Sequence, residues 1–581
     1  MGITKRVYYR KTQGRSDMKK FIPWMVIILL MLPILSLIRP GLPDGHDTQD
    51  HVARIANFYQ SLSEGNLVPR WAGNLNWGYG HPILMFLYPL PSYAASLFHY
   101  IGFSFVDSTK LVFGVSYIVS GLTMYLWMSS AFGKRAGFIS ALLYTFAPYR
   151  FVDLYVRGAI GEHVAFVFPP LIFFFLYKIA VVNNSVKQHA SCVKYIMGGS
   201  LSIAGLILSH NAVAIIFLPI VGIYGLYLLF FETKRKSTFI VYCLLSIILG
   251  FSLSAFFWIP AYFEGKYTLR DIVTADEILN RFVPWSWFFY SPWNHGEGYQ
   301  FSKEIGFMHW AIIGSFIFII RLLRRGEKIF GLIMFILFLF TLFLMTNMST
   351  PIWDFFPLMQ KFQFPWRLLS IAVFIPSVLG AIVIYTLEKN KKIHPYMTPI
   401  ILLLSLNIVL LTIPMWKPKS FIMEREEYYS GIFDSTTDTG ESSPIWSTRS
   451  MEHRPTELVS IIKGKGAIMP SRRNTTLREY TVNAQESLRI AENTLYFPGW
   501  KVFVDGKETQ IEFQDPAYRG IMTFFVPAGK HSVSIDFRNT KLRTFANIFS
   551  VISLSMLFGW FVYAFRTIYA RKHREFKNSI K

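Results

Sequence analysis

The chain is poor in charged residues, in cysteine and in nucleotide-binding signatures. Only 16% of its 581 residues are Asp, Glu, Lys or Arg, whereas soluble domains carry about 25%. Cys192 and Cys243 are its two cysteines, so a disulfide framework is not expected. We find neither a P-loop nor a glycine-rich dinucleotide turn in the sequence. A soluble nucleotide-dependent enzyme is therefore not supported.

Apolar residues dominate the sequence instead. They make up 52% of it, including 55 Phe, and this composition indicates a polytopic membrane protein. The formal net charge is +23, yet nucleic acid is not an expected partner. The basic residues lie in short clusters between apolar runs, as the positive-inside rule describes for cytoplasmic loops. These clusters are Lys134-Arg135, Lys178 to Lys194, Lys234 to Lys236, Arg321 to Lys328, Lys389 to Lys392 and Arg566 to Lys581.

Runs of about 20 apolar residues mark membrane-spanning helices. About 12 such spans are predicted, at 21–38, 109–130, 134–149, 163–181, 195–210, 212–231, 239–262, 306–322, 329–347, 367–387, 396–414 and 543–566. No small-residue cleavage site follows the first run, so we expect an uncleaved span. The run 83–102 contains Pro89 and Pro91 and is expected to lie in the outer interface, tilted or re-entrant. If it crosses, the spans number 13.

Placing the basic clusters in the cytoplasm divides the chain into regions. We expect a cytoplasmic (inner) membrane protein with both termini in the cytoplasm. The regions are a basic N-terminus (1–20), a transmembrane module (21–415) with external loops 39–107, 150–163, 263–305 and 348–366, an extracytoplasmic β-rich domain (416–542), a last span (543–566) and a basic tail (567–581).

Residues 416–542 lose the apolar runs and indicate a β-sandwich-like domain. Strands at 501–504 and 509–513 flank Asp505-Gly506, a strong hairpin signal. A second turn at 526–529 precedes 531–537, where apolar and polar residues alternate. The domain is either a rigid cap or a contact surface for a glycan, through aromatics such as Trp500 and Tyr518.

The loop after the first span gathers acidic and imidazole side chains at a membrane exit. They are Asp44, His46, Asp47, Asp50 and His51, with Arg54 close behind. Such groups are costly there unless water, a partner or a substrate meets them. Asp47 or Thr48 could simply cap a helix over 49–62. Alternatively, Asp47, His51 and Arg54 share one helical face, and Asp47 acts as a base.

Two further polar groups lie where the chain leaves or enters the membrane. Arg150, Asp153, Arg157, Glu162 and His163 form either structural ion pairs or a pocket for phosphate and sugar. Lys361, Gln363, Trp366 and Arg367 form either an interface anchor or a binding site for a lipid phosphate and its sugar. His210 is more typical of a polar residue packed between helices. Glu264, Arg270 and Asp271 are weaker candidates.

Several motifs resemble one superfamily. The run Asp44-Gly-His-Asp47, the turn Phe132-Gly-Lys-Arg-Ala136 and the Pro148/Arg157 loop are similar to GT-C glycosyltransferases. Within that superfamily, Phe362-Gln-Phe-Pro-Trp-Arg367 resembles the YfhO-like bacterial membrane proteins. So does the tail Tyr496-Phe-Pro-Gly-Trp-Lys-Val-Phe-Val-Asp-Gly506 with Val526-Pro-Ala-Gly-Lys-His531. Related proteins carry the label "6-pyruvoyl-tetrahydropterin synthase-related". The resemblance covers most of the chain.

The resemblance implies a GT-C-like helical fold and inverting transfer of a sugar. The donor would be a polyprenyl-phosphate-linked sugar, and the acceptor an envelope polymer, lipid or protein outside the cytoplasm. By position Asp47 is the base, with Asp44 second; Arg157, Arg367 and Arg54 would stabilise the leaving phosphate. The resemblance implies no particular cofactor, and no clean Asp-x-Asp is present. A divalent cation on Asp47, Asp50 and His51 stays open, although their spacing matches no specific pattern.

Two other functions compete with transfer. A flippase for lipid-linked sugars would place paired charges or broken helices at mid-membrane, where the predicted spans are nearly free of charge. A non-catalytic envelope scaffold would depend mainly on the β-rich domain. Membrane lipid is an expected neighbour in each case.

Overall fold

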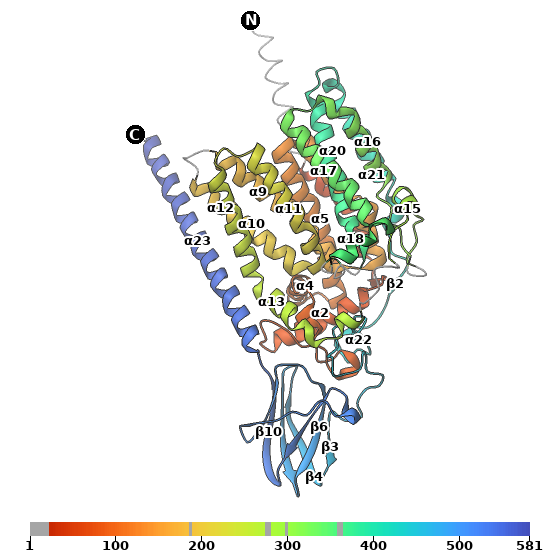
Figure 1. The fold of residues 1–581 in the computed structure, drawn as a ribbon, viewed down its shortest axis with the longest axis vertical. Helices are drawn as coiled ribbons and strands as arrows, with labels where there is room; N and C mark the ends of the chain where they lie inside the picture. Colours follow the sequence, from red (N-terminus) through yellow and green to blue (C-terminus); the bar gives the residue numbers. More distant parts are fainter. Residues whose placement is uncertain are drawn as a thin grey trace.

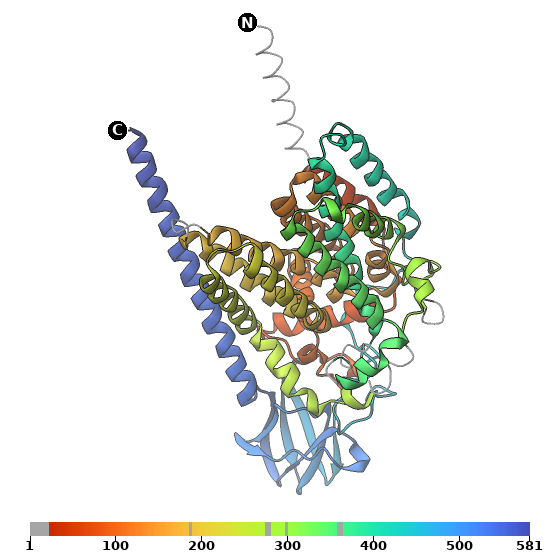
Figure 2. The ribbon, with the colours of Figure 1, turned by 45° about the horizontal axis from the view of Figure 1, so that its top comes forward.

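The computed structural model describes residues 23–184, 189–273, 281–296, 300–356, 359 and 364–580. A body of packed helices carries a β domain at one end, and the last helix, α23 (Lys541–Ile580), runs back along the outside of the body (Figure 1). The same arrangement is seen after a turn about the horizontal axis (Figure 2). We call the end of the body that carries the β sheets the β-domain end.

The first part of the chain forms a short apolar helix and then a loop-rich region. The helix covers Pro23–Ile38 and ends in η1 (Leu32–Ile38). After it come β1 (Leu42–Pro43), α2 (Thr48–Ser63), η2 (Asn76–Gly78), α3 (Ile83–Phe86) and α4 (Leu90–Tyr100). At a rise of 1.5 Å per residue, α4 is about 16 Å long, roughly half the thickness of a bilayer core. Pro89 stands at the α4 N-cap, so the prolines predicted to break the run 83–102 lie where α4 begins.

The helical body is built from these elements: α5 (Phe105–Phe132), α6 (Lys134–Thr145), α7 (Pro148–Phe151), the π-helical turn η3 (Val152–Arg157), α8 (Ile160–Ala165), α9 (Phe168–Val182), α10 (His189–Ser209), α11 (Asn211–Phe231), α12 (Lys236–Leu253), α13 (Ala255–Phe263), η5 (Gly265–Tyr267), α14 (Arg270–Val273), α15 (Trp285–Phe289), α16 (Phe307–Ile319), η7 (Ile320–Leu322), α17 (Arg325–Leu344), η8 (Asn347–Ser349), α18 (Thr350–Phe355), η9 (Pro365–Leu368), α20 (Leu369–Lys389), η10 (His394–Tyr396), α21 (Met397–Leu410) and η11 (Ile413–Met415).

Nine helices in the described ranges are long and apolar enough to cross a membrane. They are Phe105–Phe132, Ile160–Val182, Cys192–Ser209, Asn211–Phe231, Lys236–Leu253, Arg325–Leu344, Pro365–Lys389, His394–Met415 and Lys541–Val562. Pro23–Ile38 and Phe307–Leu322 are shorter apolar helices. The chain is therefore a polytopic helical membrane protein.

Two predicted spans have different boundaries in the structure. The span predicted at 134–149 is the 12-residue helix α6, which ends before Pro148 opens a new helix. The residue before a proline is driven out of the helical region, and Ala147 has an extended ψ of 138°. The span predicted at 239–262 divides at Ser254 into α12 and α13.

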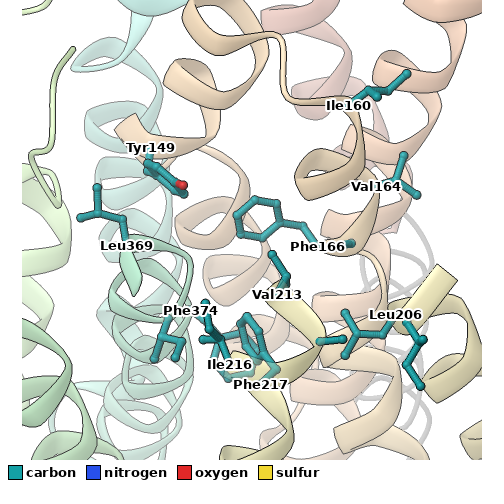
Figure 3. Close-up of a cluster of buried hydrophobic side chains, with 14 of the residues drawn as sticks. Tyr149, Ile160, Val164, Phe166, Leu206, Val213, Ile216, Phe217, Leu369 and Phe374 are labelled. Carbon is teal, nitrogen blue, oxygen red and sulfur yellow. The ribbon is translucent and has the colours of Figure 1, made fainter. Parts of the chain in front are cut away.

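Helix α20 lies at the centre of the body, packed against α6, α16 and α17. In its most apolar window 94% of the residues are buried inside the protein, as expected for a helix that is apolar on all sides. Figure 3 shows Phe374 of this helix beside Ile216 and Phe217 of α11, with Leu369, Tyr149 and Phe166 above them. These apolar side chains pack under the polar residues of the candidate site.

The β domain consists of two antiparallel sheets. One has the strand order β4-β5-β10-β7-β8, and the other has the order β3-β6-β9. The strands are β3 (Val459–Lys463), β4 (Gly466–Arg473), β5 (Leu477–Ala484), β6 (Leu488–Leu495), β7 (Trp500–Val504), β8 (Lys507–Thr509), β9 (Ile521–Val526) and β10 (Gly529–Phe537), and η12 (Pro516–Tyr518) precedes β9. Asp505 and Gly506 have φ of 50° and 78°, which a two-residue hairpin turn of type I′ requires. The predicted hairpin turn is confirmed, but its second strand is β8 (Lys507–Thr509) and not the predicted 509–513.

Trp500 is a correction to the sequence analysis. Its side chain is 3% exposed and cannot offer a glycan a surface. It packs edge-on against Trp71, with ring centroids 5.4 Å apart, and lies 5.0 Å from Phe537. Trp500 therefore joins the β domain to the loop between α2 and α3.

Two further contacts connect distant parts of the chain at the β-domain end. A two-residue antiparallel ladder pairs β1 with β2 (Phe421–Ile422), which precedes α22 (Glu426–Ser430). Glu264 forms a buried ion pair with Arg543, whose Nη2 also donates to the Pro498 carbonyl. Glu264 is thus a structural partner of α23, and the predicted span 543–566 lies within a helix that begins at Lys541.

Candidate functional site

The loop between β1 and α2 docks on the last residues of η3. The backbone N–H of His46 donates to the Val156 carbonyl and that of Asp47 to the Arg157 carbonyl, both at 2.9 Å. Gly158 has φ of +64°, and a Cβ there would lie 2.2 Å from Thr48 Cγ2. The close approach therefore depends on a residue without a side chain. Two polar groups about 110 residues apart in sequence meet here.

Asp47 and Asp44 differ in how their carboxylates are used. Asp47 is the N-cap residue of α2, as predicted, but its side chain makes no capping hydrogen bond. Within the described residues, its carboxylate has neither a hydrogen-bond donor nor an ion-pair partner. Asp44 accepts a hydrogen bond from Ser420 Oγ at 2.7 Å. Of the two candidates, Asp47 has the uncommitted carboxylate.

His51 and Arg54 lie one turn apart on α2 and contact each other. Arg54 Nη1 donates to His51 Nδ1 at 3.3 Å, and Arg54 Nε donates to Thr437 Oγ1 at 2.9 Å. Burial and the Arg54 charge hold the pKa of His51 well below its usual value, so a neutral imidazole accepts the hydrogen bond. Burial raises the pKa of Asp50 to about 6. His46 lies nearer the surface, with Nε2 3.4 Å from the His295 carbonyl.

Arg157 is held by two buried carboxylates. Its Nη1 donates to Asp153 Oδ1 and to Glu162 Oε2, both at 2.8 Å. The Tyr149 hydroxyl donates to Glu162 Oε1. The π-helical turn places Asp153 and Arg157 on one side, and the left-handed Gly158 then returns the chain toward Glu162. These contacts fix the guanidinium in one orientation.

Arg150 and His163 lie behind this network. Both side chains are 0% exposed. The Arg150 guanidinium stands 3.9 Å from the centroid of the Phe166 ring and donates through Nη2 to Ser120 Oγ. His163 Nδ1 is 3.8 Å from Asp153 Oδ2. The structure brings neither residue into contact with the first loop, so the pocket predicted to include them is divided into two layers.

The third polar group reaches the same place through an aromatic contact. The Arg157 guanidinium lies 4.5 Å from the centroid of the Trp366 ring, and Trp366 stacks on Phe364. Arg367 lies over the other ring of that pair, 5.0 Å from the Phe364 centroid. Lys361 and Gln363 fall outside the described residues.

Tyr88 is a site residue that the sequence analysis missed. Its ring stacks on His210 with centroids 4.9 Å apart. A Cβ on Gly161 would lie 1.9 Å from Tyr88 Cε2, so the ring rests directly on that glycine. Burial raises the pKa of the hydroxyl to about 12, among the charges of Arg54, Asp47, Arg367 and Arg157. A Tyr-Pro pair in a loop between apolar segments was the available signal.

His210 has a structural role as well as a place in the cluster. Its Nδ1 accepts a hydrogen bond from the Val213 backbone N–H, which makes it the N-cap of α11.

The segment after residue 416 also contributes side chains near the site. The Asp438 carboxylate lies 3.6 Å from His81 Nε2 and accepts from the Gly440 and Ser442 backbone N–H groups. No group of three His, Cys, Asp or Glu side chains placed to hold a metal ion occurs in the parts of the chain that the structure describes.

The ionisable side chains described above are buried in a body of apolar helices, near the end that carries the β domain. This arrangement is that of a polytopic membrane protein with an internal polar site. The family described as "6-pyruvoyl-tetrahydropterin synthase related domain; membrane protein" matches residues 84–418, more than half of the chain. The chain belongs to this family. The match includes η3, α8 and α20 but not the loop that carries Asp47.

Other similarities are more distant. An uncharacterized protein from Lactococcus lactis subsp. cremoris (strain MG1363) is 26% identical over 328 residues, which cover 54% of this chain and 52% of that protein. The chain thus spans about half the length of this relative. Among solved structures, the arabinofuranosyltransferase AftD from Mycobacteria is 13% identical with a TM-score of 0.43, over 70% of this chain and 28% of AftD.

Two further structures have comparable scores. ArnT from Cupriavidus metallidurans, bound to undecaprenyl phosphate, is 12% identical with a TM-score of 0.37, over 67% of this chain and 62% of ArnT. The Archaeoglobus fulgidus oligosaccharyltransferase is 14% identical with a TM-score of 0.43, over 72% of this chain and 58% of that one. At these levels the reaction has to be argued from the site itself.

Proposed function

We propose that this protein is an inverting glycosyltransferase that moves a sugar from a polyprenyl-phosphate donor to a cell-envelope acceptor. The observation that carries the proposal is the Asp47 carboxylate, which has no partner within the described residues and is positioned by backbone hydrogen bonds next to Arg157. A free base on the loop that docks on the Arg157 backbone, together with a fixed guanidinium at Arg157, suits a single displacement at a sugar phosphate. The resemblance of the first loop to GT-C glycosyltransferases supports the same reaction class.

In the proposed reaction the acceptor hydroxyl attacks the anomeric carbon of the donor sugar. Asp47 takes the hydroxyl proton as the new carbon–oxygen bond forms. The bond between the anomeric carbon and the phosphate oxygen breaks, and its electron pair leaves with the polyprenyl phosphate. One displacement inverts the anomeric centre, and neither a covalent intermediate nor a nucleotide is needed.

The leaving phosphate is assigned to Arg157 and Arg367. Asp153 and Glu162 engage only Nη1 of Arg157, so Nε and Nη2 keep their donors for an anion. Arg367 lies against the ring that stacks on Trp366, and a second guanidinium there would add charge where the phosphate departs. Arg54 is already engaged by His51 and Thr437 and is assigned an electrostatic role.

The site is assigned to the outer face of the cytoplasmic membrane. The turns Lys134-Arg135 and Lys389 to Lys392 lie where helices end away from the β sheets, and positive loops favour the cytoplasm. On this assignment both termini are cytoplasmic, and the donor and acceptor are bound outside. A divalent cation is not needed for the proposed displacement.

The test is transfer of radiolabelled sugar from polyprenyl-phosphate donors by the purified protein, with a membrane extract as acceptor. Asp47→Asn removes the base and keeps the side-chain shape, and we expect transfer to fall by about 10²–10⁴-fold. Asp44→Asn is the matched control, because that carboxylate is tied to Ser420, and it should retain most of the activity.

Transfer at the wild-type rate by Asp47→Asn would show that Asp47 is not the base. Absence of transfer by well-folded wild-type protein across the donor panel would contradict the proposal as a whole. Movement of the lipid-linked sugar across sealed vesicles, without transfer, would then identify a flippase.

A further inference from the structure

Two cations near the site have no carboxylate partner. Lys303 is 8% exposed, and its Nζ donates one hydrogen bond, to the Phe301 carbonyl at 3.2 Å. Arg281 is half-buried, and its contact is the Phe364 ring, 5.1 Å from the guanidinium carbon. Among the described residues, neither side chain lies within ion-pair distance of Asp or Glu. Glu304, the next residue in sequence, instead accepts from the Ser291 backbone N–H.

A run of three aromatic rings connects these two cations. Phe301 meets Trp366 edge-on at 4.9 Å, and Trp366 stacks on Phe364 at 5.0 Å; we call these three rings the aromatic ladder. Lys303 lies 4.4 Å from the centroid of Phe301, at the opposite end of the ladder from Arg281. Burial, together with the Arg281 charge, lowers the pKa of Lys303 to about 8.

Partly desolvated like charges that lack a counter-charge are unfavourable until an anion joins them. Cation–π contacts offset part of that cost but leave the charge in place. The protein therefore presents positive charge that its described residues do not neutralise.

The position of the two cations indicates which anion is available. The loop that carries them is fastened to the end of α17, since the Val283 N–H donates to the Met345 carbonyl. It also exposes Trp285 and Tyr290, which are 45% and 73% exposed. Aromatic belts of this kind lie at the level of lipid headgroups, where the anions are phosphates.

We infer that Arg281 and Lys303, each at one end of the aromatic ladder, bind lipid phosphate at the bilayer surface on the β-domain side. Arginine engages phosphate bidentately and lysine engages it as a point charge. The phosphate belongs either to a membrane phospholipid or to a polyprenyl phosphate. The inference does not rest on the proposed reaction, because it concerns binding alone.

The experiment measures binding of three phosphate probes by the full-length protein. The probes are phosphatidylglycerol in phosphatidylcholine nanodiscs, undecaprenyl phosphate and inorganic phosphate, followed by native mass spectrometry and by the ligand-induced rise in Tm. The test variant is Arg281→Gln with Lys303→Met, which removes both charges and keeps side-chain length. The control is Lys266→Met, because Lys266 also lies over a ring, Tyr267, but is exposed.

We expect roughly tenfold weaker binding in the double variant and wild-type binding in the control. Loss confined to phosphatidylglycerol identifies a phospholipid headgroup, loss confined to undecaprenyl phosphate identifies the polyprenyl lipid, and loss with all probes identifies the phosphate alone. Equal binding of every probe by wild type and double variant overturns the inference, as does an equal loss in Lys266→Met.

A second comparison keeps the test decisive if the double variant folds poorly. Arg281→Lys with Lys303→Arg keeps both charges, so it should bind the probes nearly as the wild type does. If this charge-retaining variant is folded yet loses binding as completely as the double variant, the charges are not the cause and the inference is wrong.

Discussion

The molecule contains two buried ion networks, one in the β domain and one in the helical body. They differ in how many of their polar atoms form hydrogen bonds. In the β domain the Glu492 carboxylate is 0% exposed and accepts hydrogen bonds from Arg473, Arg478, Tyr480 and Thr494. Both of its oxygens are satisfied. A network of this kind fixes a fold and leaves no group free for a ligand.

In the helical body the corresponding network is incomplete. Asp153 Oδ2 and Arg150 Nε and Nη1 are buried without a hydrogen bond in the part of the chain that the structure describes. Proteins depart from full satisfaction mainly at functional sites. The contrast supports the proposal that the network around Arg157 belongs to the site, whereas the β-domain network is structural.

The largest effect is expected from breaking the complete network. Glu492→Ala leaves Arg478, 3% exposed, buried without its carboxylate, and we expect a loss of about 3–5 kcal/mol in the free energy of unfolding. Thermal unfolding of the purified protein measures it. Glu486→Ala, at an exposed position in the same domain, is the control. Equal free energies of unfolding for the two variants would show that the Glu492 network does not stabilise the β domain.

Gly161→Ala tests how closely the site is packed. The new methyl group would meet the Tyr88 ring, so the ring must move away from its place above the glycine. We expect a loss of about 1–3 kcal/mol in stability, together with reduced transfer activity. The control is Gly222→Ala, whose Cβ enters open space in α11. A neutral Gly161→Ala would mean that Tyr88 can shift freely.

Asp50 gives the site a pH dependence. Its pKa in the folded protein is about 6, above the model-peptide value of 3.8, so folding favours the protonated form. Wild-type stability should therefore fall as pH rises from about 4 to about 6 and then level off. Asp50→Asn should remove that slope and add about 1–2 kcal/mol at pH 8. Parallel Tm-versus-pH curves for the two proteins would contradict this.

The smallest effect is expected at the surface. Arg454 forms a bidentate pair with Asp434, but the two side chains are 53% and 39% exposed. Arg454→Ala should change the free energy of unfolding by less than about 1 kcal/mol. Thermal unfolding at low and high salt measures the effect. A loss as large as that of Glu492→Ala would show that burial is not what separates the two kinds of ion pair.

Much of the fold could be predicted from the sequence, because apolar runs and turn residues are local signals. The hairpin at Asp505-Gly506 and the strand 531–537 are examples. The break after α6 had its own signal in Pro148, which outweighs the continuing apolar pattern. Alternation also places Trp500, Val502 and Val504 on one face of β7, which is the buried face. The burial of Trp500 could therefore have been predicted from the sequence.

The sequence predicted the polar groups of the site separately, but it did not predict that they lie next to one another. Sequence spacing put His51 and Arg54 together on α2, and the structure confirms their contact. The meeting of Asp47 with Arg157 depends on loops that approach through Gly45 and Gly158. Thr437 reaches Arg54 from 383 residues away. Contacts between loops of this separation leave no periodic pattern, so Thr437 had no signal in the sequence and Tyr88 had only its Tyr-Pro pair.

The short ladder between β1 and β2 has a consequence for the order of assembly. It pairs Leu42 with Ile422, so the strand that precedes Asp44 has no partner until residue 422 has been synthesised. At ordinary synthesis rates the interval is on the order of 20–80 s. During this interval every helix of the body from α5 to α21 is synthesised, and β1 is still unpaired. The strand before the site is thus paired late in synthesis, and a chain released before residue 422 lacks this pairing.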